Sequence, residues 1–268
     1  MFEIEIHDIK WHSIKFGKPE NPAIVFLHGF MGSSEDWQPT IKRFANTHYC
    51  IAYDLPGHGD TSVQDHDEFY SIENTISSLK REIEQSGIKD FILVGYSMGG
   101  RIALSFAIKY PELISKLVLV SASPGIESAN LREARIEVDK DIAQKIQSMD
   151  MHSFLKLWYS APIFVGINQT SLFGKLISRR EFNDKQSLIK SLEHAGTGQM
   201  KPLWNEIKTF NKPVMLLSGE RDIKYGIIHT KMHELFPNSV SYIIKDSAHI
   251  VQLEQPKEFE YKLRNFID

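Results

Sequence analysis

The stretch GYSMGG at residues 95–100 is the most informative part of this chain. It follows the apolar run FILV at 91–94 and precedes RIALSFAIKY at 101–110, whose apolar spacing predicts a helix. A G-x-S-x-G motif between a strand and a helix sets its serine on a turn too tight for flanking side chains. The hydroxyl is then exposed at a helix N-terminus, where the helix dipole favours developing negative charge. Ser97 is therefore a candidate catalytic residue.

The rest of the chain alternates between short apolar runs and helical patterns. Continuous apolar runs are typical of strands in a parallel sheet that is covered on both faces. We predict strands, including the run before Ser97, at residues 2–6, 10–15, 23–27, 49–53, 91–94, 116–120, 213–217 and 240–244. We predict helices at residues 35–46, 71–87, 98–109, 226–236 and 256–267. The alternation predicts an α/β fold with a mostly parallel, eight-stranded sheet flanked by helices.

This alternation stops between residues 123 and 210. That segment has several helical stretches and no convincing buried strand. A structureless loop of this length is improbable in a compact domain. We therefore predict a helical cap at 123–210, inserted into a core formed by residues 1–122 and 211–268.

Composition excludes several classes of protein. The 31 basic and 34 acidic side chains give a net charge of −3, without the basic excess of a nucleic-acid or anionic-membrane binder. The single cysteine, Cys50, excludes an internal disulfide and a cysteine zinc cage. No run approaches the roughly 20 apolar residues of a membrane-spanning helix. Residues 1–18 lack a signal-peptide core, so we expect a cytoplasmic protein without membrane insertion. The oligomeric state is left open.

With these motifs in their strand-and-helix context, the chain resembles the α/β-hydrolase family over essentially its full length. His28-Gly29-Phe30 follows the strand at 23–27 and resembles the family's oxyanion loop. The resemblance implies that the backbone N–H groups of Phe30 and Met98 form an oxyanion hole. Two such donors, aimed at a developing oxyanion, are worth a few kcal/mol of transition-state stabilisation.

A serine hydroxyl needs a base, and the base needs an acid that orients it. In this family the chain order is serine, then acid, then histidine. Asp222 follows the strand at 213–217, and His249 follows the strand at 240–244. Glu220 is a competing acid, but it lies nearer the end of its strand. We predict a catalytic triad of Ser97, Asp222 and His249.

The positions of the arginines narrow the range of substrates further. Arg101 lies four residues after Ser97 and can share its helix face. Four more arginines lie in the predicted cap, at positions 132, 135, 179 and 180. Arginine binds carboxylates with two parallel hydrogen bonds and stays charged at any working pH. Several arginines converging on one cleft suit a substrate with several carboxylates. The alternative for each cap arginine is a solvated surface position.

Within the family, the chain resembles the 2-succinyl-6-hydroxy-2,4-cyclohexadiene-1-carboxylate synthases of menaquinone biosynthesis. The likeness rests on GYSMGGRIAL at 95–104, SASPGI at 121–126, LWYSAPIF at 157–164 and GTGQMKPLW at 196–204. It implies a lyase that eliminates pyruvate from a small polycarboxylate without a metal or organic cofactor. It also implies a set of substrate-binding residues, namely Arg101, Arg135, Arg180, Tyr96 and Trp158, with Arg132 and Arg179 as alternatives. Gln199 departs from the spacing common in the family, which leaves its role open.

In this reading Ser97, polarised by His249, removes a proton from the substrate carbon, and no acyl-enzyme forms. Two other readings stay open. A carboxylesterase or carbon–carbon bond hydrolase would use the same triad with an acyl-enzyme or with water attack. A non-catalytic ligand-binding protein would have no need of a complete Ser-Asp-His set.

Overall fold

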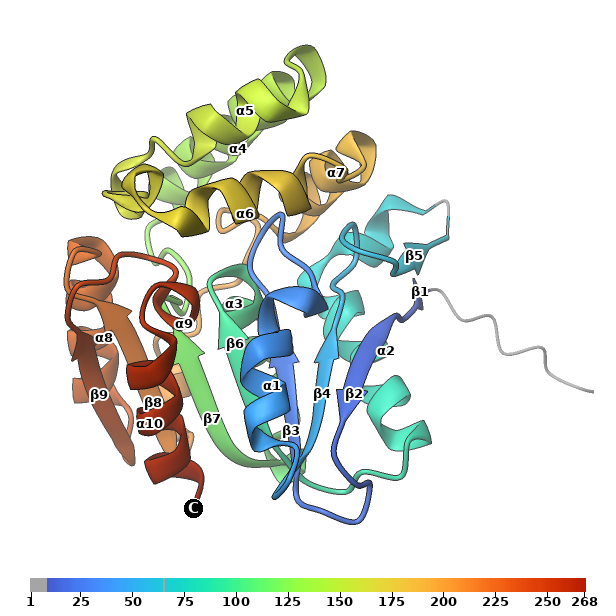
Figure 1. The fold of residues 1–268 in the computed structure, drawn as a ribbon, viewed down its shortest axis with the longest axis vertical. Helices are drawn as coiled ribbons and strands as arrows, with labels where there is room; N and C mark the ends of the chain where they lie inside the picture. The colour runs from blue at the N-terminus through green and yellow to red at the C-terminus, as the bar shows by residue number, and fades with distance from the viewer. Residues whose placement is uncertain (1–8, 65) are drawn as a thin grey trace, which may run out of the picture.

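The structure, a computed structural model, describes residues 9–64 and 66–268, and its centre is a seven-stranded sheet (Figure 1). The strands lie in the order β2-β4-β3-β6-β7-β8-β9. β2 pairs antiparallel with β4, and each of the other pairs is parallel. Their bounds are β2 (Ser13–Phe16), β3 (Ala23–Leu27), β4 (Tyr49–Tyr53), β6 (Phe91–Tyr96), β7 (Ile114–Val120), β8 (Val214–Gly219) and β9 (Ser239–Ile244). The mostly parallel sheet predicted from the apolar runs is confirmed.

The prediction of eight strands in one sheet differs from what the described residues show. The strand expected at 2–6 lies outside them. The strand expected at 10–15 is interrupted, because the backbone N–H of His12 donates to the Thr61 hydroxyl while its carbonyl accepts from Asp54 N–H. On one side of this break, β1 (Ile9–Lys10) pairs antiparallel with β5 (Ser62–Val63) in a separate ribbon. On the other side, β2 joins the main sheet.

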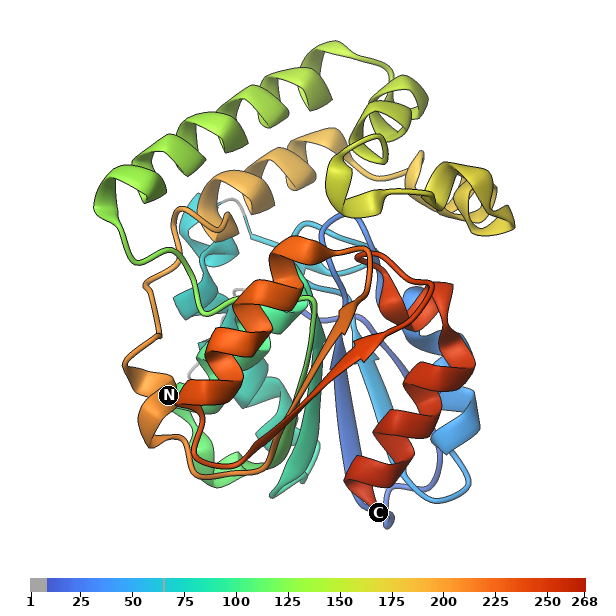
Figure 2. The same ribbon diagram turned by 90° about the vertical axis from the view of Figure 1, so that its left-hand side faces the viewer.

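Helices cover both faces of the sheet (Figure 2). Alternate residues of β3 face opposite layers: Ile24 and Phe26 pack with α1 (Gln38–Phe44) and α10 (Pro256–Ile267). The other three β3 residues pack in a second apolar cluster. That cluster includes α2 (Ile72–Gln85), α3 (Met98–Lys109) and α8 (Ile223–Leu235). Burial on both faces explains why these strands are apolar throughout rather than alternating.

The segment between β7 and β8 forms four α-helices, which we call the insertion helices. They are α4 (Ala129–Ser148), α5 (Met151–Trp158), α6 (Ser171–Arg180) and α7 (Lys185–Ala195). Side chains of Ser128, Asp150 and Asp184 accept backbone N–H groups in the first turns of α4, α5 and α7. The insertion helices lie across the carboxyl ends of the strands (Figure 1). Among residues 9–64 and 66–268, no helix combines the length and apolar character needed to cross a bilayer.

Candidate active site

Ser97 occupies a strained turn between β6 and α3. Its φ of 51° and ψ of −110° are unusual for a residue with a side chain. The turn is held because Ser97 N–H donates to the Val120 carbonyl at 2.9 Å. Glycines on either side of Ser97 permit close packing: a Cβ on Gly95 would lie 2.4 Å from the Gly99 carbonyl oxygen, and a Cβ on Gly99 would lie 2.4 Å from the His28 carbonyl oxygen. A Cβ on Gly100 would lie 2.4 Å from the Ala122 Cβ. The G-x-S-x-G pattern is thus a steric requirement of this turn.

We expect Gly99→Ala to destabilise the protein by about 1–3 kcal/mol or more, because the new methyl meets backbone that cannot yield without moving β3. Gly174→Ala is the matched control. It lies within α6, where a Cβ would meet nothing within 4 Å. That substitution should stabilise α6 by up to about 1 kcal/mol through helix propensity. Chemical denaturation of both variants measures the difference, and equal stabilities would contradict the close approach at Gly99.

The three residues predicted as a triad are hydrogen-bonded in series. His249 Nε2 lies 3.0 Å from Ser97 Oγ, and His249 Nδ1 lies 2.6 Å from Asp222 Oδ2. Asp222 is also the N-cap of α8, since its Oδ1 accepts the Tyr225 N–H at 3.4 Å. Asp222 and His249 are buried, whereas the Ser97 side chain is partly accessible. The competing acid Glu220 is exposed and accepts the backbone N–H of Asp246 instead.

The loop that carries His249 is fixed from both sides. The Glu254 carboxylate accepts the backbone N–H groups of Ala248 at 3.0 Å and Ile250 at 2.9 Å. The His249 N–H itself donates to the carbonyl of Ile163, between α5 and α6, at 3.2 Å. The imidazole is surrounded by aromatic rings, with centroids 5.4 Å away for Tyr96, 5.5 Å for Phe164 and 4.8 Å for Tyr225. These contacts therefore hold the His249 imidazole in one orientation.

A second hydrogen-bonded loop orients the candidate oxyanion donors. His28 Nε2 accepts the Leu55 N–H at 2.9 Å, so its Nδ1 carries the proton and donates to the Gly29 carbonyl at 2.8 Å. Burial lowers the pKa of His28, which matches this neutral tautomer. The Gly29 carbonyl also accepts Gly32 N–H. Because a trans peptide points its C=O and N–H in opposite directions, these bonds turn the Phe30 N–H away from His28.

The second candidate donor is Met98. It is the first residue of α3, so its N–H has no partner within its own helix. It lies directly after Ser97, as Phe30 lies directly after the loop glycine. Both Phe30 and Met98 line the same cavity as Ser97. The two residues whose backbone N–H groups we predict as oxyanion donors thus lie on the wall of the cavity that contains Ser97.

The cavity lies between the carboxyl ends of the strands and the insertion helices. Its lining comes from two parts of the chain. Residues 30–101 and 224–249 belong to the sheet and its flanking helices, and residues 135–197 belong to the insertion helices and the segments that adjoin them. The described lining residues are Phe30, Tyr96, Ser97, Met98, Arg101, Arg135, Trp158, Tyr159, Ile163, Phe164, Arg180, Ser191, Leu192, Ala195, Gly196, Thr197, Lys224, Tyr225 and His249. Every residue predicted for substrate binding is among them. The Phe30 and Trp158 rings also contact each other, with centroids 5.6 Å apart.

Of the five arginines named as candidates from the sequence, three line this cavity and two do not. Arg101, on α3, is buried and donates to the Ala195 carbonyl at 2.7 Å. Burial lowers the pKa of Arg101 to about 10, which still leaves it charged at neutral pH. Arg135 Nε donates to Asp139 at 2.8 Å, and Arg180 Nη2 donates to Asp36 at 2.7 Å. The alternatives lie elsewhere: Arg132 donates to backbone carbonyls at 126 and 127, and Arg179 is exposed.

The cavity residues that were not predicted include Lys224 and Tyr225, two polar side chains in the first turn of α8. Burial and the nearby Arg135 charge lower the pKa of the Lys224 amine. The Tyr225 ring packs against His249, and burial raises the pKa of its hydroxyl. The position of Tyr225 three residues after Asp222, in the first turn of a helix, is the signal that could have placed it there. Gln199 is exposed and lines a separate groove near Asp139 and Leu192.

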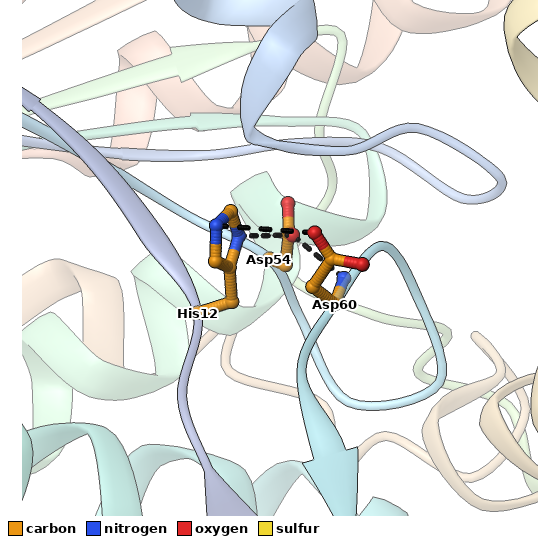
Figure 3. A group of neighbouring side chains, drawn as sticks. All are labelled: His12, Asp54 and Asp60. Carbon is orange, nitrogen blue, oxygen red and sulfur yellow. Dashed lines mark hydrogen bonds and ion pairs between the residues drawn. The ribbon is translucent and has the colours of Figure 1, made fainter.

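A cluster outside the cavity resembles a metal site. His12, Asp54 and Asp60 offer ligand atoms that all lie within 4.8 Å of one another (Figure 3). Both Asp54 oxygens are already acceptors: Oδ1 from Ser34 N–H, and Oδ2 from Asp60 N–H at 2.9 Å and His12 Nδ1 at 2.7 Å. Although burial by itself raises the Asp54 pKa, the hydrogen bonds from the Ser34 and Asp60 N–H groups hold it below its usual value. The cluster is best described as a hydrogen-bond centre for the loop after β4.

A sequence model of the alpha/beta hydrolase fold family matches residues 22–256. The chain is 33% identical over 253 residues to the putative 2-succinyl-6-hydroxy-2,4-cyclohexadiene-1-carboxylate synthase of Bacillus subtilis strain 168, covering 94% of this chain and 92% of that protein. It is 30% identical to the synthase of that name from Enterobacter sp. strain 638, covering 90% of this chain and 89% of that protein.

Solved structures of other proteins share this fold. MenH from S. aureus superimposes with a TM-score of 0.89 at 31% identity, covering 97% of each chain. The enol-lactonase from Burkholderia xenovorans LB400, at 18% identity and a TM-score of 0.82, shares the fold. This chain belongs to the alpha/beta hydrolase fold family, and within that family it resembles 2-succinyl-6-hydroxy-2,4-cyclohexadiene-1-carboxylate synthases over nearly its whole length.

Proposed function

We propose that this protein is a lyase of menaquinone biosynthesis. It eliminates pyruvate from 2-succinyl-5-enolpyruvyl-6-hydroxy-3-cyclohexene-1-carboxylate and forms 2-succinyl-6-hydroxy-2,4-cyclohexadiene-1-carboxylate. Its similarity to the named synthases supports this reaction. The single observation that carries the proposal is the convergence of Arg101, Arg135 and Arg180 on the cavity that contains Ser97 and His249.

The charge of this cavity matches the proposed substrate and distinguishes it from a simple ester. The substrate has three carboxylates: one on the succinyl group, one on the ring and one on the enolpyruvyl group. A guanidinium group can donate two parallel hydrogen bonds to a carboxylate, so the three arginines suit these three groups. The aromatic rings of Tyr96 and Trp158 offer apolar walls for the ring of the substrate. A neutral aryl or lipid ester would bring no anion to the guanidinium groups that line this cavity.

The proposed mechanism begins with proton transfer. Ser97 gives its proton to His249 Nε2 and removes the hydrogen from ring carbon 2, next to the succinyl ketone. The freed electron pair moves into the ketone, and the N–H groups of Phe30 and Met98 stabilise the oxyanion. Asp222 keeps His249 in the tautomer that accepts the serine proton and stabilises its charged form. No bond forms between Ser97 and the substrate.

Elimination then completes the reaction. The oxyanion collapses, the 2,3 double bond forms and the 3,4 double bond shifts to 4,5. The bond between ring carbon 5 and the enolpyruvyl oxygen breaks. The departing enolpyruvate takes up a proton, which balances the one that His249 accepted from Ser97, and becomes pyruvate. The arginines hold the carboxylates so that the carbon–hydrogen and carbon–oxygen bonds are oriented for these steps.

We further propose that residues 123–210 act as a cap over a core of residues 1–122 and 211–268. Arg135, Trp158 and Arg180 come from the insertion helices, whereas the triad comes from loops of the core. A substrate held by both parts would be shielded from water. Such shielding strengthens the hydrogen bonds made to the oxyanion.

The proposal is tested by pyruvate release from the enolpyruvyl cyclohexene substrate, followed with a lactate dehydrogenase-coupled assay. The substrate eliminates pyruvate on its own, so the rate without protein is subtracted. We expect a rate well above this background. A rate equal to background, combined with burst turnover of p-nitrophenyl acetate, would favour a carboxylesterase or carbon–carbon bond hydrolase instead.

A further inference from the structure

The two arginines that reach the cavity from the insertion helices are each held by a buried carboxylate, in different ways. Arg135 pairs with Asp139 one turn further along the same helix. Arg180 pairs with Asp36, which lies 144 residues away in the sequence. The first pair is local to α4, whereas the second connects the core with the insertion helices. Only the second depends on how the two parts fit together.

Asp36 is built into the loop that carries the candidate oxyanion donor. It lies in the short helix Ser34–Trp37, directly after that loop. A Cβ on Gly32 would lie 2.5 Å from Asp36 Oδ2, so the carboxylate packs directly against the loop backbone. The side chains of Asp36 and Arg180 are 6% and 5% exposed. A charge this buried is stable only when it is paired, which holds the two groups together.

The Arg180 guanidinium still has a donor to offer. Its Nε–H is buried and has no hydrogen-bond partner among the described residues. The guanidinium also lies over the Tyr159 ring, 5.6 Å from its centroid, which restricts its rotation. An unpaired buried N–H is energetically costly until an acceptor arrives, and Arg180 is one of the residues that line the cavity. A carboxylate is an acceptor of the required charge and shape.

We propose that Asp36 is a positioning residue for substrate binding. It fixes Arg180 through Nη2, so that Nε–H stays available for one carboxylate of the substrate. Asp36 itself does not touch the substrate. This inference rests on the proposed function, because it assigns a role to Arg180 in binding a carboxylate. It explains why an acidic residue lies next to a cavity that must attract anions.

Arg179 offers the competing explanation for Asp36. Its Nη1 lies 3.6 Å from Asp36 Oδ1, but its side chain is 43% exposed and does not line the cavity. If Asp36 acts through Arg180, then Arg179→Gln leaves ligand affinity unchanged. If Asp36 acted through Arg179, that substitution would weaken binding as much as a change of Asp36 does.

The test measures binding without turnover. The probe is 2-succinylbenzoate, an aromatic compound with the same succinyl and ring carboxylates, titrated by calorimetry. We expect Asp36→Asn to raise its Kd about 10- to 100-fold, because a charge-assisted hydrogen bond orients Arg180. The matched control, Glu35→Gln, removes a charge from the neighbouring exposed residue and should change Kd by less than about twofold. An unchanged Kd for Asp36→Asn overturns the proposal.

A double-mutant cycle separates positioning from general damage. Arg180→Lys keeps the charge and can still pair with Asp36, but it lacks the Nε–H donor. We expect it to weaken the probe at least about tenfold, with a melting temperature near that of the unaltered protein. Adding Asp36→Asn should then weaken binding little further, because the two residues act in series. The proposal is overturned if the two substitutions raise Kd by factors that multiply in full in the double variant. It is also overturned if the Arg180→Lys variant binds the probe normally.

Kinetics provide the remaining readout. In the pyruvate-release assay, Asp36→Asn should raise KM in parallel with the Kd of the probe while kcat stays within about threefold. A fall in kcat with KM unchanged would show that Asp36 acts on the oxyanion loop instead. If Asp36→Asn does not fold, Arg180→Lys decides the outcome alone. A protein that binds the probe but releases no pyruvate would contradict the proposed function and leave the role of Asp36 intact.

Discussion

Ser97→Ala should lower kcat/KM for pyruvate release by about 10²–10⁴-fold, the range expected when a positioned base is removed. The methyl group cannot take a proton from the substrate or pass one to His249, which lies 3.0 Å from the missing oxygen. The Kd of 2-succinylbenzoate should change little, because the arginines that bind carboxylates are untouched. Steady-state kinetics and calorimetry on the same preparation separate these two effects.

A matched serine substitution is the control. Ser77→Ala removes a hydroxyl from α2, where Ser77 Oγ donates to the Glu73 carbonyl outside the cavity. It should leave kcat/KM within about twofold of the starting protein. If Ser97→Ala retained full activity, the serine would be a bystander. The reaction would then have to be assigned to another base.

Asp222→Asn should lower kcat/KM on the order of 10³-fold, because it changes the tautomer of His249. The carboxylate accepts the Nδ1 proton at 2.6 Å and leaves Nε2 free to accept from Ser97. An amide NH₂ facing Nδ1 would favour the opposite tautomer, with a proton on Nε2 pointing at the serine. Asn can still cap α8 with its carbonyl oxygen, so stability should fall much less than activity.

Glu220→Gln tests the competing acid two residues earlier. Glu220 is exposed and bonds the Asp246 backbone, so this variant should keep kcat/KM within about twofold. The pair of variants thus compares the same chemical change at two nearby positions. A large loss in Glu220→Gln with a small loss in Asp222→Asn would reverse the assignment of the acid.

Much of the core could be predicted because its signals are local. The strands at 23–27 and 49–53 were predicted with the bounds that the structure has, since both are buried on two faces and apolar throughout. The stretch at 10–15 was predicted as one strand, but it is divided at His12, whose backbone is hydrogen-bonded to residues 54 and 61. Those partners are distant in sequence, so no local pattern reveals them.

The start of helix α8 was also not predictable from a local pattern. Apolar spacing predicted its start at residue 226, whereas it begins at Ile223. The added turn forms because Asp222 caps it with the carboxylate that also bonds His249. This turn brings Lys224 and Tyr225 to the cavity. The sequence motif located Asp222 but did not predict that a helix begins directly after it.

The sequence by itself determined the family, the order of Ser97, Asp222 and His249, and the turn that demands glycine at 99. Each of these depends on a few neighbouring residues, so a short motif encodes it. Tertiary structure alone decided which cap arginines reach the cavity, because Arg179 and Arg180 are adjacent and only the rotation of α6 separates them. It also decided that Asp36 holds Arg180. A buried ion pair between residues 144 apart is created by packing the insertion helices on the core.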